Sequence, residues 1–156
     1  MTYLDLKFLH IIGAAVLLGT GARLAFFMMM AHRAKDVAVI ARVARIVGIS
    51  DFLFTATAVV IQPVTGLLLA NVQNYPLTRS WIVVSLALYL LIGAFWLPVV
   101  YFQMRIRDIA AEAVAQRKPL PAGYYWYYRV WFAFGFPAFF SLLTIFWLMI
   151  ARPQLW

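Results

Sequence analysis

The 156-residue sequence has no cysteine and few acidic residues, with 5 Asp and Glu against 13 Lys and Arg. Without cysteine, disulfides, thiolate metal sites and iron–sulfur clusters are excluded. Five acids are also too few for a carboxylate-rich di-metal site, because only Asp51 lies deep in an apolar segment. No glycine-rich nucleotide-binding motif is present, since Gly19-Thr-Gly21 lies inside an apolar run. The sequence therefore assigns no catalytic residue through a known motif.

Apolar residues dominate instead. They make up 66% of the chain, and only 12% of residues are charged, whereas a soluble domain is about half apolar and about a quarter charged. A membrane-spanning helix needs about 20 apolar residues, so residues 1–156 form one domain with four spans. The predicted fold class is an all-α polytopic membrane protein, a four-transmembrane-helix bundle. The expected spans are approximately 4–31, 46–71, 81–104 and 130–151.

Two polar segments are expected to extend the spans at one surface of the membrane. In 32–45 the apolar residues recur at near-helical spacing, which predicts a short interfacial helix that continues into the second span. Residues 105–116 are expected to be a helical extension of the third span, and 117–123 a loop. The aromatic run 124–128 is typical of the membrane–water interface.

The basic residues are distributed unevenly. Nine fall in 32–45 and 105–129, whereas Lys7, Arg79 and Arg152 fall at the opposite ends of the spans. The positive-inside rule therefore places both long loops in the cytoplasm and both termini outside. Orientation and contact with anionic lipid headgroups explain the net charge of +8. We therefore expect membrane lipid, and not nucleic acid, as a partner.

His10 is the most informative residue, because it lies inside the apolar run 9–18. An imidazole in the bilayer is costly and usually functional. Successive helical residues turn by about 100°, which places Gly13, Ala14 and Leu17 on the face of His10. Small residues there suit either close helix packing or a flat ligand against the backbone, and both interpretations stay open.

Polar residues of the other spans are expected at two depths. Gln62, Tyr89 and Lys7 fall at the level of His10, in the outer half of the membrane. In the inner half, Arg23 and Asp51 are expected to form a structural intramembrane pair, since pairing offsets the cost of each charge. An alternative for Arg23 is a lipid headgroup, which its long side chain reaches by snorkelling.

The second histidine, His32, lies 22 residues after His10, which is about 33 Å along a helix. The two imidazoles are therefore too far apart to ligate one haem or metal ion within one chain, and His32 is interpreted as an interfacial residue.

The residues also support a resemblance. Segment 3–12 carries the pattern Leu-Lys-x-Leu-His-Ile, and 62–68, 105–108 and 128–132 follow in order. This arrangement resembles an uncharacterised family of small four-helix bacterial integral membrane proteins. More remotely, it resembles the membrane-bound, haem-b-containing bacterial protoporphyrinogen IX oxidase. The resemblance implies the bacterial cytoplasmic (inner) membrane, His10 as an axial ligand of haem iron, and Lys7 as a neighbouring functional residue.

That oxidase has a further histidine in its third helix, and residues 81–104 have none. A five-coordinate haem, a Tyr89 ligand and a site shared between protomers of a homo-oligomer stay open. Our first hypothesis is a haem b protein, with or without redox enzyme activity, in which Lys7 pairs with a propionate and Tyr89 and Gln62 line the pocket. Quinone or another redox partner would exchange electrons with it. The alternatives are a non-catalytic accessory or assembly subunit, and a small-solute transporter acting as an oligomer.

Overall fold

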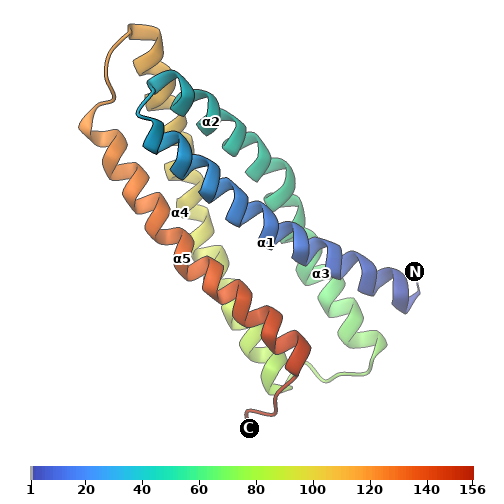
Figure 1. Cartoon of the computed structure of the whole chain (residues 1–156). Helices are drawn as coiled ribbons and strands as arrows, with labels where there is room; N and C mark the ends of the chain where they lie inside the picture. Colours follow the sequence, from blue (N-terminus) through green and yellow to red (C-terminus); the bar gives the residue numbers. More distant parts are fainter. Residues whose placement is uncertain (1) are drawn as a thin grey trace.

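A computed structural model describes residues 2–156 as an all-helical protein, which confirms the predicted fold class (Figure 1). Within these residues, four helical rods are long and apolar enough to cross a membrane. The second rod, Val37–Val72, is continuous but contains a π-helical turn. The elements are α1 (Tyr3–Ala34), α2 (Val37–Ser50), η1 (Asp51–Thr55), α3 (Ala56–Val72), α4 (Ser80–Gln116) and α5 (Ala122–Ala151).

The interfacial helix begins later than the sequence indicates. α1 runs to Ala34 and stops at Lys35, whose backbone is left-handed with φ of 56°. The Asp36 carboxylate then caps α2 by accepting from the backbone N–H of Ala38 at 2.8 Å, as Asp commonly does at a helix N-terminus. The chain therefore turns within two residues, and the helix expected at 32–45 starts at Val37.

The bounds of the other two long helices are closer to the predicted ones. α4 continues to Gln116, so the helical extension at 105–116 is confirmed. α5 begins at Ala122, and the aromatic run 124–128 therefore forms its first turns. Pro63, Pro98 and Pro137 each lie inside a continuous helix.

The core lies where α1, α2, α4 and α5 meet, near the short connections 35–36 and 117–121; we call this the loop end. Ala44 and Ala110 are buried there, and their small side chains let the helices approach closely around Met28 and Ile106. Tyr124 is also fully buried, and its hydroxyl lies 3.2 Å from Nδ1 of a histidine on α1, His32.

That histidine also stacks on Tyr128, with ring centroids 3.9 Å apart. His32 is therefore part of an aromatic cluster on α1 and α5.

At its other end the bundle divides into two helix pairs. α3 packs against α1, and α4 packs against α5. Figure 1 shows the two pairs diverging toward the end where both chain termini lie, which we call the terminal end. The link between α3 and α4, residues 73–79, crosses from one pair to the other at this end. The divergence creates the space in which the candidate site lies.

Candidate functional site

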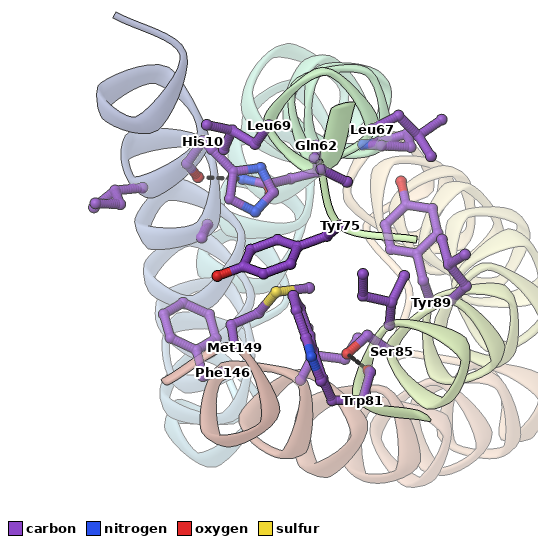
Figure 2. A pocket seen from close by; sticks show the side chains of 18 of the residues that line it. His10, Gln62, Leu67, Leu69, Tyr75, Trp81, Ser85, Tyr89, Phe146 and Met149 are labelled. Carbon is purple, nitrogen blue, oxygen red and sulfur yellow. Dashed lines mark hydrogen bonds between the residues drawn. The ribbon is translucent and has the colours of Figure 1, made fainter. Parts of the chain in front are cut away.

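A cavity of about 480 Å³ lies between the two helix pairs at the terminal end (Figure 2). This volume falls within the range of about 300–1,000 Å³ that is typical of small-molecule sites. Its walls are mainly apolar, with Leu, Ile, Met and Phe side chains from all four spans. The polar or amphipathic residues that line it are Tyr3, Lys7, His10, Gln62, Gln73, Tyr75, Trp81, Ser85, Tyr89 and Arg152.

The structure brings the expected site residues together. His10, Lys7, Gln62 and Tyr89 all line this cavity, although they come from three different spans. Figure 2 shows His10 and Gln62 on one side and Tyr89 on the α4 side.

Three further residues, Tyr75, Trp81 and Arg152, line the cavity without having been expected there from the sequence. Tyr75 lies on the α3–α4 link, and Arg152 directly follows α5, so periodicity does not predict their positions. Trp81 lies in the first turn of α4.

Hydrogen bonds fix the orientation of the His10 ring. Nδ1 lies 2.9 Å from the hydroxyl oxygen of Thr65. That hydroxyl donates its own proton to the carbonyl of Ile61, at 2.8 Å, so it accepts from Nδ1–H. In this tautomer, assigned from the hydrogen-bond pattern, Nε2 carries the lone pair. Within residues 2–156 the hydrogen bond of the His10 side chain is made at Nδ1, so Nε2 has no hydrogen-bond partner there.

Two glycines let α1 and α3 approach at this point. The Gln62 amide donates to the backbone carbonyl of His10 at 2.7 Å, and a Cβ on Gly13 would lie 2.6 Å from the amide nitrogen. In the reciprocal contact, a Cβ on Gly66 would lie 3.2 Å from Cε1 of His10. Each polar side chain therefore rests on a glycine of the opposite helix.

Tyr89 connects the two helix pairs. Its hydroxyl donates to the backbone carbonyl of Val59. In a regular helix that carbonyl accepts from the N–H four residues later, but Pro63 occupies that position and has no N–H. The tyrosine thus satisfies the carbonyl that the proline leaves free, and its hydroxyl is already engaged.

The rim of the cavity is cationic. Arg152 donates from Nη1 to the Tyr75 hydroxyl at 2.8 Å, and Lys7 lies over the ring of Tyr3, 5.8 Å from its centroid. No Asp or Glu of residues 2–156 lines the cavity. The site is therefore an apolar chamber with one available imidazole nitrogen and positive charge at its mouth.

The expected pair of Arg23 and Asp51 is not formed, and the structure corrects this prediction. Across residues 2–156 the single ion pair is Arg107 with Asp108, at 2.7 Å. Arg23 is exposed on α1, whereas Asp51 is 7% exposed within the π-helical turn.

The neighbours of the Asp51 carboxyl are neutral: Thr55, Trp96 and Gln103. The Gln103 amide oxygen accepts from the indole N–H of Trp131 at 3.2 Å, which ties α4 to α5 beside the acid. Asp51 is thus surrounded by polar neutral groups rather than a counter-ion, and Arg23 faces outward.

A family model described as "Predicted integral membrane protein (DUF2269)" matches residues 4–153. The chain belongs to this family. No curated protein and no solved structure matches the chain. Family membership supports the membrane assignment, and the chemistry of the site depends on its own residues.

Within residues 2–156, no group of three or more His, Asp or Glu side chains is placed to hold a metal ion. Among the described residues that line the cavity, His10 is the only histidine.

Gly13→Ala should destabilise the contact between α1 and α3. The added methyl would collide with the Gln62 amide and break its bond to the His10 carbonyl, which is worth about 0.6 kcal/mol for an average hydrogen bond in a membrane protein. The midpoint of unfolding in detergent is the measurement. Gly19→Ala is the matched control, because nothing lies within 4 Å of a Cβ there. Equal midpoints for the two variants would contradict the proposed contact.

Tyr89→Phe should destabilise the protein by about 0.6–1.5 kcal/mol, because the Val59 carbonyl loses its donor. In a Pro63→Ala background the restored N–H at position 63 satisfies that carbonyl, so the same substitution should cost much less. A double-mutant cycle on the free energy of unfolding measures this difference. An equal cost of Tyr89→Phe in both backgrounds would show that the tyrosine does not compensate for the proline.

Proposed function

We propose that this protein binds haem b in the cavity between its helix pairs, with Nε2 of His10 as the axial ligand of the iron. The observation that carries the proposal is the free Nε2 of an imidazole whose Nδ1 is bonded to Thr65, at the wall of an apolar cavity. Metal-ligating histidines almost always donate their other ring N–H to a fixed acceptor. Thr65 supplies that acceptor before any metal binds.

The cavity suits such a group in two further respects. Its apolar walls exclude water from a flat, apolar macrocycle, and its cationic rim suits negatively charged propionates. Since the Tyr89 hydroxyl is engaged by Val59, the geometry favours a five-coordinate haem over Tyr89 as a second ligand. A ligand contributed by a second protomer stays an alternative.

Haem supplies one-electron and oxygen chemistry when it is bound. The residues of this chain hold and orient it: Thr65 fixes the imidazole, and Gln62 holds the backbone of α1 beside it. The apolar walls keep water from the iron ligand. We also propose that the protein is remotely related to protoporphyrinogen oxidase and that the haem exchanges electrons with quinone.

The location in the membrane is also part of the proposal. The resemblance to bacterial membrane proteins suggests the inner membrane, and the charge asymmetry between the loop end and the terminal end supports both termini outside. The cavity then lies in the outer half of the bilayer.

His10→Ala should abolish the haem spectrum. The wild-type protein, purified in detergent and supplied with haem, is expected to show a Soret band that shifts on reduction with dithionite. Without the imidazole the iron has no axial ligand, so the band should fall to that of free haem. His32→Ala is the matched control and should keep the full spectrum, because His32 lies in the aromatic cluster at the loop end.

Thr65→Ala should weaken haem binding about tenfold or more, the usual effect of removing the group that orients a ligating histidine. Thr65→Ser keeps the hydroxyl and should bind haem as the wild type does. Haem titration followed by absorption measures both. If the alanine variant bound as tightly as the serine variant, the orientation of His10 through Thr65 would be wrong.

A wild-type protein that stays colourless after haem is added would overturn the proposed function. In that case, a His10→Ala variant that loses a partner complex would favour an accessory subunit. A variant that loses solute flux in vesicles would favour a transporter.

A further inference from the structure

A second pocket adjoins the cavity at the terminal end. Its volume is about 520 Å³, and its lining includes Arg79, Ser80, Trp81, Arg152 and Gln154. Trp81 and Arg152 line both this pocket and the main cavity. An apolar chamber and a polar, cationic pocket therefore share a wall, which is the arrangement that an amphiphilic ligand requires.

The two arginines of this pocket converge on one aromatic ring. The guanidinium carbons of Arg79 and Arg152 lie 4.7 Å and 5.5 Å from the centroid of the Tyr75 ring. Arg152 also lies 5.9 Å from the Trp81 ring and donates to the Tyr75 hydroxyl. Stacking holds both side chains in place, which lowers the entropy lost when they bind a ligand.

Within residues 2–156, no Asp or Glu side chain lines either pocket. The single ion pair in this part of the chain is Arg107 with Asp108 on α4, so neither Arg79 nor Arg152 is in an ion pair. Two neighbouring cations repel each other, and an anion that contacts both would add two attractive interactions. Guanidinium groups bind carboxylates and phosphates through paired hydrogen bonds.

The shared wall holds an unsatisfied donor as well. Trp81 is 8% exposed, and its indole Nε1 has no hydrogen-bond partner in the described part of the chain. Buried polar atoms usually have a partner. By contrast, the Ser80 hydroxyl already bonds the Pro153 carbonyl and the Leu155 N–H. An acceptor atom of a ligand at the junction of the two pockets would satisfy the indole.

We propose that Arg79 and Arg152 bind the anionic group of an amphiphile whose apolar body occupies the main cavity. The identity of that amphiphile rests on the proposed function: in haem b the anionic groups are the propionates, and these two arginines bind them in place of Lys7. A phospholipid offers the same chemistry through its phosphate. The shared feature is an oxyanion at the end of an apolar body.

The first arm of the test compares haem with its dimethyl ester, which has no anionic group. The wild type should bind the ester about tenfold or more weakly than haem, as expected for the loss of charge-assisted hydrogen bonds. The Arg79→Gln/Arg152→Gln double variant should bind haem as weakly as the wild type binds the ester. Arg23→Gln removes an exposed cation outside both pockets and is the matched control.

The second arm tests a lipid phosphate. The protein is placed in vesicles of equimolar phosphatidylglycerol and phosphatidylcholine, and the lipid that stays bound is identified by native mass spectrometry after detergent extraction. Phosphatidylglycerol retained by the wild type and lost by the double variant would support the anion site with a lipid as the source, even if no haem binds.

The two proposals fail in different ways. If the wild type bound haem and its dimethyl ester with equal affinity and retained no lipid preferentially, the anion site would be wrong. The haem proposal would still stand. Retained phosphatidylglycerol without any haem spectrum would overturn the haem proposal alone. The ester comparison uses the wild-type chain, so a variant that does not fold leaves the test intact.

Discussion

The close contact of α1 with α3 at the terminal end determines the rest of the site. His10 rests on Gly66, and Gln62 rests on Gly13. In a bilayer, apolar side chains gain little by leaving lipid for a neighbouring helix, so association depends on packing and hydrogen bonds. The glycines remove the side chains that would keep the helices apart, and the Gln62 amide then reaches the His10 carbonyl. The same approach brings Thr65 within reach of the imidazole.

If all four rods packed as closely along their whole length as α1 and α3 do here, no cavity would remain between the helix pairs. At the loop end, α1, α2, α4 and α5 share one core, in which the small side chains of Ala44 on α2 and Ala110 on α4 let the helices approach closely. At the terminal end each pair is closed within itself, and the space between the pairs is left to the cavity. Tyr89 bridges this space to a carbonyl freed by Pro63. Pro63 removes one hydrogen bond from α3, and the carbonyl that it leaves free accepts the hydrogen bond from Tyr89 that connects α4 to α3.

Periodicity and depth were enough to predict the four spans and the meeting of His10, Gln62 and Tyr89. A helix advances a fixed 1.5 Å per residue, so residues of different spans can be matched by depth before any contact is known. The π-helical turn at Asp51 could not be found in this way, because it changes the hydrogen-bond register without a distinctive sequence. The Arg23–Asp51 prediction failed for a related reason: charge counting assumes a counter-ion, and here neutral side chains surround the acid. Tyr75 and Arg152 lie outside regular helix, where depth arguments do not apply.

The charged residues near the π-helical turn and those beside the cavity have different surroundings. Near the π-helical turn Asp51 is buried among neutral groups, and it forms no ion pair within residues 2–156. In the pocket beside the cavity, Arg79 and Arg152 both lie over the Tyr75 ring, and no Asp or Glu of residues 2–156 lines that pocket. A buried carboxylic acid can lose its charge by taking up a proton, whereas a guanidinium keeps its charge at any accessible pH. The acid can therefore be accommodated within the chain, whereas the arginines keep their charge and suit an anionic ligand. Because Arg152 lines both pockets, a ligand with an apolar body and an anionic end fits the proposed anion site.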